Sequence, residues 1–156
     1  MKNIMRFVLA VALPLAVGGI AGFFTSASVK GWFTTIEKPS FNPPSWIFAP
    51  VWTLLYIMMG IAFYLVWTKA APGRTKQTAM IFYFAQLFFN FCWSFLFFYA
   101  EKPGWALVDI VVLWVLIALT IYWFGKVYKP AAWLLVPYIL WVSFATALNF
   151  AIWQLN

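Results

Sequence analysis

The sequence contains no histidine and only one cysteine, Cys92. A single cysteine cannot form an intramolecular disulfide, and a chain without histidine lacks the usual zinc sites, His-ligated haem and Ser-His or Cys-His nucleophiles. No glycine-rich phosphate-binding motif is present either. These absences argue against hydrolases and ATPases, and we expect neither a metal site nor a required cofactor.

Charge is equally scarce. Only 8% of the 156 residues are charged, whereas 66% are hydrophobic and 23% aromatic, and the mean hydropathy is +0.92. Soluble domains carry about 25% charged residues. A bilayer core of about 30 Å needs about 20 apolar residues per helix, and the charged clusters leave room for five such spans. The predicted fold is an all-α integral membrane protein, a five-transmembrane-helix bundle in one domain, 1–156, with spans near 4–25, 44–68, 77–100, 104–125 and 130–154.

Lysine and arginine are distributed unevenly between the two ends of these spans. If the spans alternate in direction, one side carries Lys2, Arg6, Lys69, Arg74, Lys76, Lys126 and Lys129. Because basic loops stay in the cytoplasm, we expect a cytoplasmic N-terminus, with the C-terminus and the loop at 27–45 on the opposite side. The net charge of +7 then reflects topology and contact with membrane lipid, and we expect no nucleic-acid partner.

The first span resembles a signal peptide only superficially. Its apolar run exceeds the usual 7 to 15 residues of a signal peptide. It also contains Gly18 and Gly22, a spacing that lets another helix approach closely. We therefore expect this span to be retained, with the two glycines serving packing within the chain more readily than a dimer interface.

Polar side chains at membrane depth are candidates for contacts in the bundle interior. Gln86 and Asn90 lie four residues apart on one face of the third span, Asp109 lies about one turn inside the fourth, and Asn149 lies in the fifth. One interpretation is that they form interhelical hydrogen bonds that fix the bundle, and the other is that they orient a ligand. We expect Asp109, near a helix N-terminus, to be structural.

The fifth span shows a stripe with a period of four residues. Its members are Trp133, Pro137, Trp141, Ala145 and Asn149. Proline at position 137 should kink this helix, and Pro14 and Pro50 should kink the first and second spans. Three kinked helices favour an internal cavity.

Tryptophan is concentrated at span ends, as in the interfacial belt of membrane proteins, but four tryptophans lie further inward. They are Trp52, Trp93, Trp114 and Trp141. Tyr56 lies one turn beyond Trp52. A cavity walled by such rings suits a flat aromatic or polycyclic ligand. The proline-rich loop at 27–45 is stiff, and it can act as a lid that places Trp32 and Phe33 over the cavity, or as a rigid linker without that role.

Four segments resemble one known family. They are "EKPSFNPPSWIFAPVWTLLYIMMG", "AQLFFNFCWSFLFF", "GWALVD" and "LLVPYILWVSFATALNFAIWQLN". In this order they resemble the tryptophan-rich sensory protein and translocator protein family, once called the peripheral benzodiazepine receptor. The resemblance covers nearly the whole chain. It implies a five-helix membrane protein, often a homodimer, that binds porphyrins such as protoporphyrin IX, or isoquinoline carboxamides, below the first long loop.

The resemblance also implies roles for particular residues. Trp52 and Trp141 match the tryptophans assigned to light- and oxygen-dependent porphyrin degradation in some bacterial members. Pocket positions are matched by Trp32, Phe33, Tyr56, Trp93 and Ala145, with phenylalanine at position 33 where some relatives have tyrosine. Animal members carry a sterol motif with Tyr and Arg after the "ATxLN" segment, and "ATALNFAIWQLN" lacks it.

The ligand-binding set expected from the sequence adds three polar residues to these pocket positions, namely Gln86, Asn90 and Asn149. Porphyrin is expected as ligand or substrate. Two alternatives stay open at this point. One is a transporter of tetrapyrroles or lipid, and the other is a porphyrin- or stress-sensing regulator without catalysis.

Overall fold

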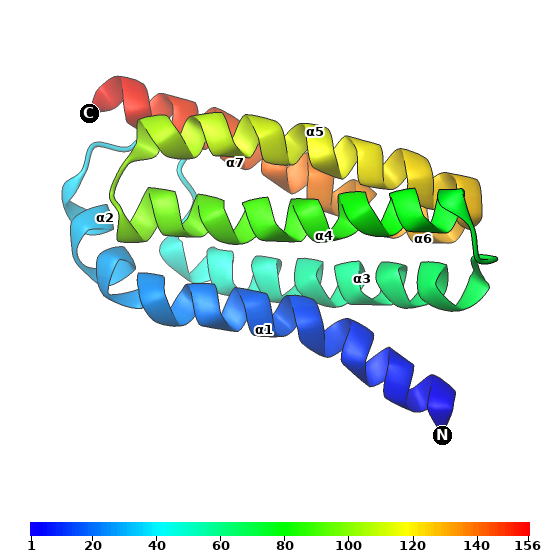
Figure 1. The fold of residues 1–156 in the computed structure, drawn as a ribbon. Helices are drawn as coiled ribbons and strands as arrows, with labels where there is room; N and C mark the ends of the chain where they lie inside the picture. The colour runs from blue at the N-terminus through cyan, green and yellow to red at the C-terminus, as the bar shows by residue number, and fades with distance from the viewer.

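The computed structural model describes residues 1–156 and consists of helices and connecting loops (Figure 1). Five helical segments are long and apolar enough to cross a membrane: Lys2–Thr35, Ser45–Lys69, Arg74–Tyr99, Pro103–Val127 and Lys129–Leu155. The predicted five-helix membrane fold is therefore confirmed. The individual elements are α1 (Lys2–Lys30), α2 (Trp32–Thr35), η1 (Ser45–Ile47), α3 (Phe48–Lys69), α4 (Arg74–Ser94), η2 (Phe95–Tyr99), α5 (Pro103–Val127), α6 (Lys129–Leu134) and α7 (Val136–Leu155).

The helices pack chiefly in three pairs, α4 on α5, α1 on α3 and α5 on α7. Stacked aromatic rings contribute to the core between α3, α4 and α5. The ring of Tyr83 lies between those of Phe63 and Phe124, with centroid distances of 4.8 and 5.8 Å. These rings stabilise the packing of α3, α4 and α5 against one another, because offset stacking adds specific attraction to the burial of the rings.

One glycine lets two helices touch through their backbones. A Cβ atom at Gly60 would lie 2.6 Å from Cα of Val11 and 2.7 Å from the carbonyl oxygen of Ala10. Only glycine allows α1 and α3 to approach this closely. In α1, a Cβ atom at Gly18 would clash with the ring of Tyr56, whereas one at Gly22 would meet nothing within 4 Å. Gly18 thus serves packing within the chain, as expected, and Gly22 borders open space.

The three prolines expected to kink helices behave differently. Pro14 lies inside α1, and the N-terminal part of α1 diverges from α3 in Figure 1. The fifth span is interrupted at Leu135, and Pro137 lies in the first turn of α7. The kink predicted at Pro50 is wrong. That residue lies in the first turn of α3, where a backbone amide has no helical partner to lose.

The third span ends in a turn of π-helix, η2. The amide of Ala100 donates to the carbonyl of Phe95 at 2.8 Å, and the amide of Lys102 donates to that of Leu96 at 2.9 Å. Such a turn holds one residue more than an α-helical turn. It brings the neighbouring side chains Phe97 and Phe98 to the same side of the helix, where both face the interior of the bundle.

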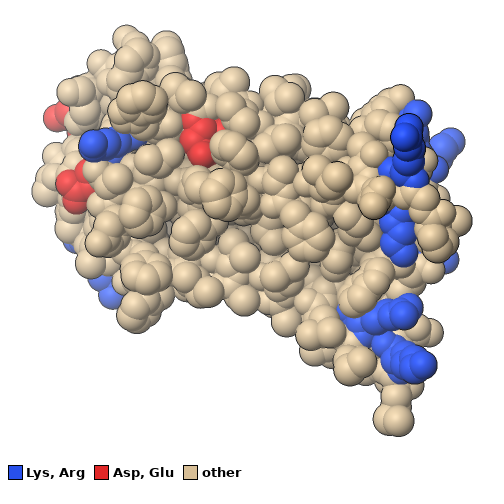
Figure 2. All heavy atoms as spheres, viewed as in Figure 1, with Lys and Arg blue, Asp and Glu red and all other residues tan.

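Basic residues are distributed unevenly between the two ends of the bundle, although some lie at each end (Figure 2). The start of α1, the end of α3, the start of α4, the end of α5 and the start of α6 meet at one end, and Lys and Arg gather there. We call this the cationic end. Its residues are Lys2, Arg6, Lys69, Arg74, Lys76, Lys126 and Lys129. The opposite end carries the acidic side chains.

Candidate functional site: an aromatic cavity

The half of the bundle away from the cationic end encloses a cavity of about 430 Å³. Its walls come from α1, α2, the start of α3, the junction of α4 and η2, and α7. This volume lies within the range of about 300 to 1,000 Å³ that holds single small ligands. The cavity is mainly apolar. The exposed part of its lining lies on α1 and on η1 with the start of α3, and consists of Gly19, Gly22, Ser26, Lys30, Ser45, Ala49 and Thr53.

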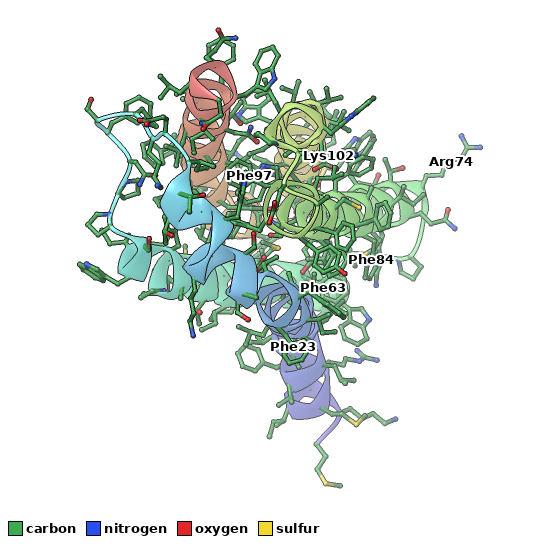
Figure 3. All side chains as sticks on the ribbon, turned by 90° about the vertical axis from the view of Figure 1, so that its left-hand side faces the viewer. Phe23, Phe63, Arg74, Phe84, Phe97 and Lys102 are labelled. Atoms are coloured by element: carbon green, nitrogen blue, oxygen red, sulfur yellow. The ribbon has the colours of Figure 1, made fainter.

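Aromatic rings form two groups in the cavity wall. In the first, the ring of Trp52 lies 5.7 Å from that of Tyr56 and 6.1 Å from that of Trp93. Trp93 in turn stacks on Phe97 at 5.5 Å, and Figure 3 shows Phe97 projecting into the middle of the bundle. In the second group, the ring of Trp141 lies 5.4 Å from that of Phe144. All six side chains named here line the cavity.

A chain of hydrogen bonds lies behind this wall. The hydroxyl of Tyr56 donates to Oδ1 of Asn90 at 2.7 Å, and Nδ2 of Asn90 donates to the hydroxyl of Tyr138 at 2.7 Å. That hydroxyl donates to Oε1 of Gln86 at 2.8 Å. Gln86 and Asn90 are each 1% exposed and do not line the cavity. The network joins α3, α4 and α7, and it supports the interpretation that these amides fix the bundle.

Asn149 lines the cavity but is already engaged in hydrogen bonds. Its Oδ1 accepts from the indole nitrogen of Trp93 at 3.0 Å, and its Nδ2 donates to the carbonyl of Pro103 at 2.8 Å. The amide therefore holds Trp93 in place and ties α7 to the start of α5. Ala145, one turn earlier on α7, lines the cavity with a methyl group and leaves it room.

Trp141 is the one indole of the wall with a buried nitrogen that has no partner. Its Nε1 forms no hydrogen bond, although the atom is shielded from solvent, and the residue lines the cavity. Burying a donor without a partner costs about 1 to 3 kcal/mol. Because this nitrogen is shielded, the cavity is lined by the ring of Trp141 and not by its N–H group.

The segment 27–45 closes one end of the cavity. Val29, Lys30, Phe33 and Ser45 from this segment all line it. Phe33 is 3% exposed and lies under the ammonium group of Lys38, 5.1 Å from the ring centroid. Trp32 packs against Phe97 at 5.9 Å instead and does not line the cavity.

The same segment is fastened to the end of α7. The amide of Glu37 donates to Oδ1 of Asn156 at 3.0 Å, and Nδ2 of Asn156 donates back to the carbonyl of Glu37 at 2.9 Å. A further bond at 2.8 Å links the same Nδ2 to the carbonyl of Ile152. These bonds join residues far apart in sequence and tie the loop after α2 to the end of α7.

Several residues that the sequence grouped together lie apart. Trp133 is 71% exposed, and Pro137 is exposed as well. The helix break at Leu135 separates Trp133 from the rest of the predicted stripe, of which Trp141, Ala145 and Asn149 line the cavity. Trp114 is 40% exposed and donates to Oγ of Ser143 outside the cavity.

Asp109 is buried on α5 and lies outside the cavity lining. Sequence reasoning did not identify Lys30, Tyr138, Phe97 or Phe98 as parts of the site or its support. The two phenylalanines lie in an apolar run without a periodic pattern, and the π-turn that directs them inward has no evident signature in the sequence.

Comparison with known proteins agrees with the five-helix membrane fold. The model of the TspO/MBR family matches residues 10–154. The chain is 46% identical to the tryptophan-rich protein TspO of Chlorobaculum tepidum over 99% of this chain and 98% of that one. It is 44% identical to the protein of the same name from Archaeoglobus fulgidus, over 99% of both chains. It is also 39% identical to the human translocator protein, over 97% of this chain and 89% of that one. The chain therefore belongs to the TspO/MBR family of membrane proteins.

Proposed function

We propose that this protein is a membrane receptor that binds a porphyrin of the protoporphyrin IX class in the aromatic cavity. The observation that carries the proposal is the wall of the cavity, where Trp52, Trp93 and Trp141 present large flat rings to one enclosed space. Stacking on such rings favours a broad, planar, polycyclic ligand over an aliphatic one. Family membership is consistent with a receptor-like role in the membrane.

The polar groups of the cavity suit a ligand with few hydrogen-bonding atoms. Tyr56 and Asn149 already use their polar atoms within the protein. The indole nitrogen of Trp141 has no partner but is shielded, so the ring is the part of this residue that a ligand meets. Affinity then comes mainly from ring contacts and the release of water, and one or two hydrogen bonds set the orientation.

The binding test is quenching of tryptophan fluorescence by protoporphyrin IX, measured in the dark on protein purified in a nonionic detergent. Saturable quenching that is weakened in Trp141→Ala and retained in Trp114→Ala is the expected result. Trp114 is the matched control because it lies outside the cavity. Quenching that rises without saturation, or that both variants lose equally, would contradict a specific site.

A second part of the proposal concerns light. When the bound porphyrin is illuminated in the presence of oxygen, it is oxidised and bleached, and this reaction depends on Trp52 and Trp141, which line the cavity beside it. The test is porphyrin absorbance during illumination in air, compared with illumination under argon and with darkness. The double variant Trp52→Phe plus Trp141→Phe, saturated with porphyrin, should bleach it more slowly than the unmodified protein. Equal rates would reduce the protein's role to binding alone.

A further inference from the structure

The lining of the cavity contains one charged side chain, Lys30. No aspartate or glutamate lines the cavity, and the whole sequence contains only three acidic residues. Lys30 is the last residue of α1, and its side chain is exposed. Because the residue both lines the cavity and reaches solvent, it lies at the mouth.

The surroundings of Lys30 favour an anion at this mouth. An unpaired cation at the edge of an apolar cavity attracts negative charge more strongly than the same cation in open water. The carbonyl ends of α1 offset part of this potential, since a helix C-terminus carries about half a negative charge. A full positive charge on the lysine still exceeds that partial charge.

A second cation lies near the same opening. Lys38 is held by a hydrogen bond of 3.0 Å from its Nζ to the carbonyl of Ile36. Its ammonium group lies over the ring of Phe33, which lines the cavity. Lys38 therefore adds positive potential at the mouth, while Lys30 remains available for direct contact.

We infer that Lys30 binds a carboxylate of the ligand while the aromatic part of that ligand lies among Trp52 and Trp141. This inference rests on the proposed function and specifies the ligand class, which is a porphyrin with acidic side chains as opposed to a neutral one. The carboxylate stays at the wet mouth, where its desolvation cost is small, and the ring fills the dry interior.

The experiment compares protoporphyrin IX with its dimethyl ester, which has the same ring and no carboxylate. Both are titrated in the dark, by fluorescence quenching, against the unmodified protein and Lys30→Gln in dodecyl maltoside. An exposed ion pair contributes up to about 1 kcal/mol, so the diacid should bind Lys30→Gln about three- to fivefold more weakly than it binds the unmodified protein. The ester should bind both proteins within about twofold of each other, and Lys30→Arg should restore diacid binding.

Lys102→Gln is the matched control. Lys102 is a cation of the same end of the bundle (Figure 3), but it lies in the connection between η2 and α5 and does not line the cavity. This variant should bind both porphyrins as the unmodified protein does, with the thermal transition of each variant measured to confirm folding. Added salt should weaken binding of the diacid and leave the ester unaffected.

The outcomes separate this inference from the proposed function. If diacid and ester bind equally well, or if Lys30→Gln weakens both to the same degree, the carboxylate contact is wrong and porphyrin binding stands. If Lys102→Gln has the same effect as Lys30→Gln, the attraction is a general surface effect and the inference is also wrong. If neither porphyrin gives saturable quenching, the proposed function fails and this inference with it.

Discussion

The hydroxyl of Tyr56 donates a hydrogen bond of 2.7 Å to Asn90, while the ring of the same tyrosine lines the cavity. One side chain therefore connects the ligand space to the buried network of α3, α4 and α7. The hydroxyl contributes to the stability of the bundle, and the ring contributes to the shape of the site.

Tyr56→Phe should separate these two contributions. Removing the hydroxyl leaves the Oδ1 of Asn90 without its donor, which costs about 1 to 3 kcal/mol in a buried site. The thermal transition in detergent should fall, while porphyrin affinity changes by less than about threefold because the ring remains. Tyr64→Phe is the control, since Tyr64 is half-buried on the same helix and its hydroxyl forms no hydrogen bond within the protein. A larger loss of affinity than of stability would mean that the hydroxyl contacts the ligand.

Gly60→Ala should destabilise the contact between α1 and α3. The added methyl would overlap the backbone of Val11 and Ala10, and backbone cannot rotate away as a side chain can. Overpacking of this kind costs about 1 to 3 kcal/mol, more than the helix propensity gained by alanine. Gly19→Ala, where the methyl meets nothing within 4 Å, should leave the thermal transition unchanged or raise it. The same transition temperature in both variants would contradict the close crossing.

Trp141→Phe should weaken porphyrin binding without weakening the fold. The indole nitrogen has no partner within the protein, so its loss removes no hydrogen bond. Trp114→Phe should behave in the opposite way, because its indole donates to Ser143 at 2.8 Å and lies outside the cavity. Affinity by quenching and stability by thermal unfolding, measured on both variants, check this contrast. If the two variants changed porphyrin affinity equally, Trp141 would not contact the ligand.

Asn156→Ala should accelerate exchange of the ligand. The side chain forms two hydrogen bonds with Glu37, and without them the segment over the cavity opens more often. Association and dissociation rates, measured by stopped-flow quenching, should both rise by about two- to tenfold, with little change in affinity. Gln154→Ala, an exposed neighbour without a hydrogen bond to that segment, is the control. Unchanged rates would show that ligand enters by another path, such as between helices from the bilayer.

The orientation in the membrane stays a prediction that cysteine labelling can test. In a Cys92→Ser background, a cysteine at Thr75 lies at the cationic end and one at Ser40 lies at the other. A membrane-impermeant maleimide applied to intact cells should label the cysteine at position 40. The cysteine at position 75 should be labelled only after the cells are lysed. The reverse pattern would place the N-terminus outside.

The sequence predicted the number and approximate bounds of the membrane helices because apolar length is a direct requirement of the bilayer. It also identified Trp52, Tyr56, Trp93, Trp141, Ala145 and Asn149, all of which line the cavity. Gln86 and Asn90 were correctly placed on one helix face, but the rotation of α4 in the bundle decides what that face contacts. This rotation follows from packing against partners distant in sequence, such as Tyr138.

Other expectations failed for local reasons. The stripe that began at Trp133 assumed one continuous helix, and the break at Leu135 interrupts the four-residue spacing. The kink at Pro50 assumed a helix interior, whereas the helix begins immediately before that residue. The role of Lys30 depends on where α1 ends relative to α3 and α7, which no periodicity within α1 reveals.

The π-turn at Phe95–Tyr99 bears on how this chain tolerates insertions and deletions. The turn holds one residue more than an α-helical turn, so deleting one residue there would let it close into a regular α-helix while the residues that follow keep their direction. The part of the cavity wall that Phe97 and Phe98 form together would then change. Evolution can vary the length of the loop at 70–73 without changing that wall, because no helix runs through this loop. Across related sequences, gaps should therefore accumulate in that loop and be rare between Trp93 and Pro103.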